Sequence, residues 1–112
     1  MEFKPTIKYE DFEKLDIRIG TIKSAERVHD SKKLLKLTVD FDNFERQIMS
    51  GIARVYDPEV MIGKQCVFLV NLESRVIAGF ESQGMILATH GEGDLPVLIH
   101  PEKPIASGSS IS

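Results

Sequence analysis

Apolar and polar residues alternate along two early stretches of the chain, in the period-two pattern of a strand that buries one face. The clearer stretch runs from Leu35 to Phe41, and the other begins at Ile17. The earlier alternation breaks at Gly20-Thr21 and then resumes. A glycine at such a phase shift predicts a β-bulge or a sharp bend in the first strand.

A turn and a returning strand are expected after residue 41. Asp42-Asn43 follows the longest alternating stretch, and both residue types tolerate positive φ better than most. The pair therefore predicts a tight turn, with residues 44–49 as the partner strand and Ser50-Gly51 at its end.

Two short helices are expected beside the strands. The spacing of Tyr9, Phe12 and Leu15 favours one helical turn that caps a barrel or sheet. A second helix is predicted over residues 57–63, because Asp57 can be its N-cap and Pro58 suits the first helical position. A glycine closes this segment, as at many helix ends.

The second half of the chain adds further strands. Residues 66–70 are apolar on both faces, which predicts a central, covered strand. Residues 84–88 and 95–99 predict two more. Short strands with one helix after the third are typical of an all-β OB-fold, a five-stranded Greek-key barrel. We predict this barrel, with a short helix and terminal extensions, as one domain over residues 1–112.

Composition and residue spacing argue against an enzyme or a metal site. Three separated histidines and one cysteine give no metal-ligand spacing. Cys66 lies within an apolar run, where a thiol is usually inert, and no serine lies in a nucleophile elbow. We predict a binding protein with no catalytic residue, no metal and no cofactor. With no signal peptide or membrane segment, it is expected to be soluble and cytoplasmic.

Charge limits the kind of partner that the chain can bind. The net charge of −3 opposes general polyanion binding, but a local basic face remains possible. The stretch Ser31-Lys32-Lys33-Leu34-Leu35-Lys36 allows two interpretations. It is either an edge strand kept soluble by lysines or a phosphate-contacting loop on a barrel rim.

Residues 71–88 carry most of the functional signal. The segment joins two predicted buried strands, and Asn, Arg and Ser side chains of this kind can bond phosphates, sugars and base edges. Rim loops between strands are common places for function. Each residue also has a structural alternative: Met85 as core, Gly79 and Gly84 as turn glycines, and Asn71 as a bond to its own turn.

The same segment resembles a known family. Its sequence NLESRVIAGFESQGMILA is similar to the signature of the tRNA-binding domain of methionyl-tRNA synthetase, found at its C-terminus or as its beta subunit, and in stand-alone tRNA-binding proteins. DIRIG at residues 16–20, SKKLLKLTVD at 31–40 and SGI at 50–52 resemble further motifs of the family. Ser74 departs from the proline usual in the family, and the loop before Lys33 is shorter than in many relatives.

This resemblance implies an OB-fold homodimer that grips the outer corner of tRNA by shape. Lys33 and Arg75 are then expected to contact phosphates, Asn71 and Ser82 to bond sugar or base edges, and Met85 to pack on an exposed base or shape the rim. The expected partners are tRNA, a second copy and possibly methionyl-tRNA synthetase, with no membrane.

A second branch of the same fold leaves an alternative function open. Residues 11–18 also resemble the CsaA-type secretion chaperones, which would imply binding of unfolded or export-bound polypeptides. That branch does not keep the Ser-x-Gly-Met motif at residues 82–85, so the tRNA interpretation is favoured. A structural dimerisation module is the third possibility.

Overall fold

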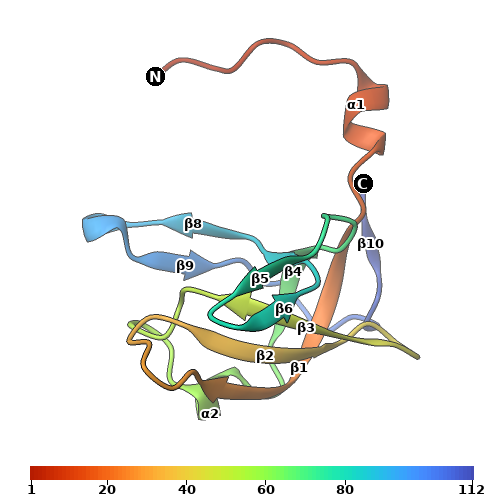
Figure 1. Cartoon of the computed structure of the whole chain (residues 1–112). Helices are drawn as coiled ribbons and strands as arrows, with labels where there is room; N and C mark the ends of the chain where they lie inside the picture. Colours follow the sequence, from red (N-terminus) through yellow and green to blue (C-terminus); the bar gives the residue numbers. More distant parts are fainter.

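A small β-barrel makes up the centre of the molecule, with a helix and an extended segment at its N-terminal end (Figure 1). The computed structural model describes all residues 1–112. In chain order, its helices and strands are α1 (Tyr9–Glu13), β1 (Ile17–Arg27), β2 (Leu35–Asp40), β3 (Glu45–Ser50), α2 (Pro58–Met61), β4 (Gln65–Leu69), β5 (Arg75–Ile77), β6 (Phe80–Ser82), β7 (Met85–Ile86), β8 (Ala88–His90), the 3-10 turn η1 (Glu92–Asp94), β9 (Pro96–Leu98) and β10 (Ser110–Ile111).

Five antiparallel strands form the barrel in the order β3-β2-β1-β4-β7. β1 is long enough to pair with β4 along its first half and with β2 along its second half. The barrel closes where the Gln83 N–H donates to the Gln47 carbonyl at 2.8 Å, next to the start of β7. These strands and α2 confirm the predicted OB-type barrel.

The predicted irregularity in β1 lies further along the strand than expected. The register with β2 shifts between Ile22 and Ser24, after the strand has left β4, and not at Gly20-Thr21. Glycine is required at position 20 for a different reason, because a Cβ there would lie only 2.5 Å from Val39 Cγ1. The break in the apolar alternation located the bend only to within a few residues, because Gly20-Thr21 and the observed register shift both lie where β1 curls round the barrel.

The turn between β2 and β3 confirms the prediction from Asp42-Asn43. Both residues have positive φ, 69° and 66°, as a type I′ hairpin turn requires. The Phe41 N–H donates to the Phe44 carbonyl at 2.9 Å and closes the turn. β2 itself lies between β1 and β3, so its one lysine, Lys36, does not protect a sheet edge, and Lys32 and Lys33 lie in the loop before the strand. The edge-strand interpretation of this basic stretch was therefore wrong.

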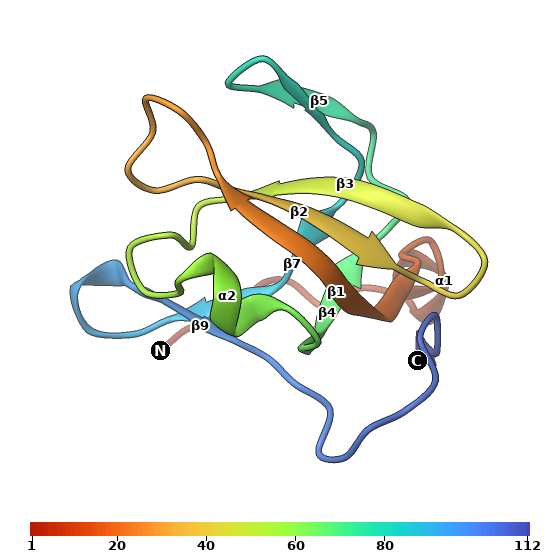
Figure 2. The ribbon, with the colours of Figure 1, turned by 90° about the horizontal axis from the view of Figure 1, so that it is seen from below.

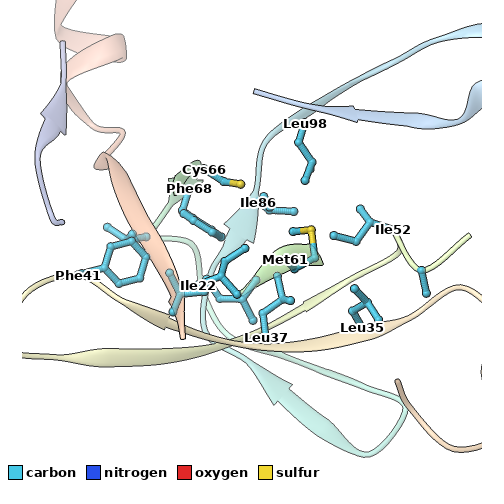
Figure 3. Packing of buried hydrophobic residues seen from close by; sticks show 14 residues of the cluster. Ile22, Leu35, Leu37, Phe41, Ile52, Met61, Cys66, Phe68, Ile86 and Leu98 are labelled. Atoms are coloured by element: carbon cyan, nitrogen blue, oxygen red, sulfur yellow. The ribbon is translucent and has the colours of Figure 1, made fainter. Parts of the chain in front are cut away.

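The barrel interior is filled by residues from the five barrel strands and from α2, with Leu98 of β9 beside them (Figure 3). Its fully buried side chains are Phe68, Ile22, Leu35, Leu37, Ile48, Met61, Val39 and Cys66. Met61 of α2 is 0% exposed and closes one end of this core. Asp57 is the N-cap residue of α2, as predicted, but its carboxylate makes no capping bond and pairs with Arg27 Nη2 at 2.8 Å.

The last predicted strands are divided differently from the expectation. Residues 84–88 split into β7, which completes the barrel, and β8, which leaves it. β8 pairs only with β9 and forms a hairpin that projects to one side (Figure 1). The predicted cap also differs, because α1 forms but buries no residue and stands away from the barrel. No helix has the length and apolar character needed to cross a membrane.

Candidate nucleic-acid interface

The segment predicted as a rim loop is a β-hairpin. β5 and β6 pair antiparallel with Arg75 opposite Ser82, and the turn residues Ala78 and Gly79 have φ of 53° and 85°. Gly79 is thus a turn glycine, as its structural alternative proposed. The three-residue strands were too short to give a readable alternation, and Ala-Gly is a weaker turn signal than Asn-Gly.

Side-chain hydrogen bonds attach this hairpin to the outer edge of β3. The Gln47 N–H donates to Gln83 Oε1 at 3.1 Å, and Gln47 Nε2 donates to the Glu81 carbonyl at 2.9 Å. The Met49 N–H donates to Ser82 Oγ at 3.0 Å. These bonds satisfy the free edge of β3 and fix where the hairpin lies beside the barrel.

Ser82 is the buried member of the predicted site. It is 5% exposed, and its hydroxyl accepts from Met49 N–H and donates to the Gly84 carbonyl at 3.1 Å. Gly84 itself has φ of 139°, and a Cβ there would lie 2.9 Å from the Leu69 carbonyl oxygen. The Ser82 hydroxyl is therefore engaged within the protein, at the point where the chain passes from the hairpin back to the barrel.

Asn71 is also held by intramolecular bonds. Its Oδ1 accepts from the Asp16 N–H at 2.8 Å, and its Nδ2 donates to the Lys14 carbonyl at 2.7 Å. Both partners are backbone groups of the segment between α1 and β1. Asn71 thus bonds a remote backbone and not its own turn, and it ties the start of the hairpin segment to the N-terminal part of the chain.

Arg75 and Met85 are the exposed members of the predicted site. Arg75 makes no ion pair, and Met85 is 43% exposed, so it is not core. Together with Ser82 they line a small hollow of about 60 Å³ between the hairpin and β3, whose lining is half hydrophobic and also includes Glu73. Its floor includes Met49, which is buried but lies outside the barrel core. The structure thus brings three of the five predicted residues together.

Lys33 lies apart from this hollow, on the exposed loop between β1 and β2. Its carbonyl accepts from the Ala53 N–H at 2.9 Å, and Ser31 Oγ accepts from the Leu34 N–H at 3.2 Å within the same loop. Figures 1 and 2 both place this loop beside the tip of the β5–β6 hairpin, on one side of the barrel.

Lys36 and Phe80 connect the two regions and were not among the predicted site residues. Lys36 Nζ lies 4.7 Å from the centroid of the Phe80 ring, so β2 and the hairpin meet in a cation–π contact. In the sequence, the only indication of this role was that Lys36 is one of the polar residues that alternate with apolar ones along residues 35–41, and so lies on the outer side of the strand. Nothing in the sequence paired it with an aromatic residue 44 positions later.

We call this surface the hairpin face: the loop at residues 28–34, the polar side of β2 at Lys36, and the β5–β6 hairpin. Its exposed cations are Lys32, Lys33 and Arg75, with Lys36 partly covered. The face also carries Asp30 on the loop and Glu81 on the hairpin, with Glu73 just before β5, so its excess of positive charge comes from the lysines.

Charged and nucleophilic groups elsewhere give no support to catalysis. Burial raises the pKa of the Cys66 thiol to about 11, which opposes formation of the reactive thiolate. Lys23 pairs with Glu45 on the barrel surface, and this hydrogen bond raises the pKa of Lys23. No cluster of three or more His, Cys, Asp or Glu side chains could hold a metal ion.

Comparison with known proteins agrees with this geometry. Residues 17–110 match the family model described as "Putative tRNA binding domain". The chain is 50% identical over 111 residues to a methionine–tRNA ligase of Archaeoglobus fulgidus, covering 99% of this chain and 17% of the relative. It therefore spans about a sixth of the length of the curated relatives that it matches.

Two solved structures share the whole fold. A methionyl-tRNA synthetase-related protein from Pyrococcus horikoshii superimposes with a TM-score of 0.91 at 36% identity, covering 97% of this chain and 100% of that one. The chaperone CsaA from Bacillus anthracis gives 0.88 at 34% identity, covering 96% and 100%. The family match spans most of the chain and agrees with the barrel described above. The chain therefore belongs to the tRNA-binding domain family and resembles the tRNA-binding domain of methionyl-tRNA synthetase.

Proposed function

We propose that the hairpin face holds folded tRNA and that the chain catalyses no reaction itself. The observation that carries this proposal is the unpaired Arg75 beside the hollow that Met85 lines, on a hairpin next to the loop that carries Lys32 and Lys33. Arginine and lysine can neutralise phosphates, while the exposed Met85 offers apolar surface to an unstacked base.

We assign different roles to the five predicted residues. Arg75 and Lys33 contact phosphates, and Met85 packs against a base. Ser82 and Asn71 position these groups, because their polar atoms already bond Met49, Gly84, Lys14 and Asp16 within the protein. This assignment replaces the direct sugar or base contacts that the sequence predicted for Ser82 and Asn71.

Filter binding of folded and heat-unfolded tRNA at two salt concentrations tests the proposal. We expect tighter binding of folded tRNA, because structured RNA is recognised by geometry. The affinity should also fall with salt as counterion release predicts. Equal affinity for both forms, or no binding at moderate salt, would contradict it.

We infer that the chain is a homodimer joined through its two ends. Phe3 and Ile7 are 86% and 64% exposed on the extended N-terminal segment, which covers little of its own barrel. A hollow of about 200 Å³ lies nearby between α1, the start of β1 and β10, and includes Tyr9 and Ile111. An apolar segment of this kind would be shielded by a second copy.

Light scattering of the unaltered chain and of a Phe3→Ser, Ile7→Ser double variant tests this inference. The expected result is a dimer for the first and a monomer for the second. A monomeric unaltered chain would contradict the dimer and would leave tRNA binding standing, because the hairpin face lies within one copy.

Methionyl-tRNA synthetase is the protein partner that we propose. The curated relatives carry this domain as a small part of a much longer methionine–tRNA ligase. A separate copy could hold tRNA for the enzyme and increase its apparent affinity through effective concentration. Aminoacylation assays with and without the chain should give a lower KM for tRNA in its presence, and an unchanged KM would count against the partnership.

A chaperone function is the alternative, favoured by the likeness to CsaA and by the exposed apolar N-terminal segment. A chain with this function would suppress the aggregation of an unfolded polypeptide. Arg75→Ala and Ser82→Ala should weaken tRNA binding and leave such protection intact if the two functions use different surfaces. Protection without tRNA binding by the unaltered chain would favour the chaperone.

A further inference from the structure

A second groove lies next to the hairpin face and has no assigned role. Its volume is about 340 Å³, within the range of small-ligand sites, and its walls include Ser50, Gly51, Ile52, Met85, Ile86 and His90. We call it the β3–β7 groove. Met85 also lines the hollow beside Arg75, so this residue forms the ridge between the two.

The groove presents polar groups without partners in the protein. Ser50 is 6% exposed, and its hydroxyl makes no hydrogen bond. No fully buried side-chain polar atom of the chain lacks a partner, so this hydroxyl must remain accessible at the groove. The N–H and C=O of Gly51 are likewise unpaired, and His90 is exposed with no hydrogen bond through its ring. A nearly buried serine whose hydroxyl has no partner within the protein is available to bond a ligand in the groove.

The walls of the groove are otherwise apolar. Ile52 and Ile86 are barrel-core residues that also border the groove, and Figure 3 shows them on neighbouring sides of the core. Leu87, Pro96 and Met85 extend this apolar surface outward, and no carboxylate lines the groove. Its occupant should therefore have flat apolar faces, a hydrogen-bonding edge and no need for an acidic partner.

We propose that the β3–β7 groove takes one unstacked nucleobase of the bound RNA, with Ser50, Gly51 and His90 meeting its polar edge. The proposal rests on the tRNA-binding function given above. The groove continues the hairpin face across Met85, and the Lys33 carbonyl bonds Ala53, two residues after Gly51. A strand whose phosphates meet Lys33 and Arg75 would thus pass the mouth of the groove.

Filling the groove tests the proposal without disturbing the barrel. A Cβ at Gly51 meets no atom within 4 Å, so there is room to begin a side chain there, and Gly51→Val adds bulk at the wall of the groove. Gly91→Val is the matched control, since a Cβ there makes only ordinary contacts, the nearest at 3.7 Å, and Gly91 lies outside the groove. His90→Ala is a second groove variant at an exposed position, with Thr89→Ala as its control.

The measurements are tRNA affinity and its dependence on salt, after circular dichroism has confirmed folding. We expect Gly51→Val and His90→Ala to weaken binding about tenfold, the effect of losing one base contact. The slope of log affinity against log salt should stay unchanged, because no phosphate contact is lost. The two controls should bind as the unaltered chain does.

Other outcomes separate this proposal from the proposed function. If both groove variants keep full affinity while Arg75→Ala weakens binding, the base site is wrong and the tRNA surface stands. Weaker binding with a reduced salt slope would indicate a phosphate contact and would also overturn the base site. Loss of polypeptide protection without loss of tRNA affinity would identify a peptide groove. Failure of the unaltered chain to bind tRNA would remove the function on which the groove depends.

Discussion

The barrel and the β5–β6 hairpin are held in place by different interactions. Neighbouring barrel strands pair along five or six residues, except β4 and β7, which pair along two, and they bury side chains such as Phe68 and Leu37 completely. The hairpin strands have three residues each, and bonds from Gln47, Ser82 and Gln83 attach them to β3. The barrel thus owes its stability to apolar burial, while the position of the hairpin depends on a few polar groups.

This difference separates stability from function on the molecule. Changes in the barrel should reduce the free energy of unfolding and leave the binding surface intact in the folded fraction. Changes on the hairpin should weaken binding and leave the free energy of unfolding nearly unchanged. Ser82 is the exception, because it belongs to both regions.

The largest effect on stability is expected for Phe68→Ala in the barrel. Phe68 is fully buried and packs edge-on against Phe41, with ring centroids 5.5 Å apart. Its removal should lower the free energy of unfolding by about 3–5 kcal/mol, measured by urea titration. Phe44→Ala is the control, since Phe44 is 42% exposed and should lose far less. Equal losses would mean that burial does not distinguish the two aromatic residues.

Ser82→Ala should affect both regions. It leaves the buried Met49 N–H without its acceptor, which should lower the free energy of unfolding by about 1–3 kcal/mol. We also expect weaker tRNA binding, since the hairpin loses a bond to β3. Ser74→Ala, on the exposed approach to the hairpin, makes no such bond and should change neither quantity. A fully stable Ser82→Ala variant would contradict the positioning role.

Arg75→Ala should change binding alone. It removes an exposed, unpaired guanidinium, so the free energy of unfolding should stay within about 0.5 kcal/mol. The tRNA affinity should fall about tenfold, and the salt slope should shrink by about 1. Lys103→Ala removes an exposed cation near the C-terminal end and outside the hairpin face, and it should bind normally. Equal losses in both variants would indicate charge-driven binding without a defined surface.

At neutral pH the smallest effect is expected from the buried thiol, because it is protonated in both the folded and the unfolded chain. The pKa of Cys66 is raised from 9.0 to about 11 in the folded chain. Above pH 9 the unfolded chain therefore releases a proton that the folded chain retains, and the free energy of unfolding should decline between pH 9 and 11. Cys66→Ala should reduce this decline, and Cys66 should resist thiol reagents at pH 8. Rapid modification of the native thiol would contradict its burial.

The barrel could be predicted because its strands carry the period-two pattern of apolar burial. Residues 35–41 gave β2, and Asp42-Asn43 gave its turn, since both depend on local sequence. The bulge in β1 was misplaced, because its position depends on where β1 leaves β4 for β2. The capping role of α1 was also wrong, since its apolar spacing did not reveal that the helix would stand away from the barrel.

The sequence located the segment that carries the candidate site, but it did not predict which of its side chains are exposed or which residues they contact. The resemblance of residues 71–88 singled out Arg75 and Met85, and the structure places both beside one hollow. It did not distinguish them from Ser82, whose burial depends on a bond to Met49 from another strand. The contact between Lys36 and Phe80 could not be predicted from the sequence either, because it depends on how the hairpin lies against β2.

Chemical-shift mapping of the isotope-labelled chain with tRNA tests the central claim most directly. The account predicts that the largest changes fall on amides of residues 28–34, on the β5–β6 hairpin, and at Ser50 and Gly51. Amides near Lys103 and Lys64, which border a separate groove, should stay unchanged. Shifts centred on that groove or on α1, with the hairpin unaffected, would contradict it.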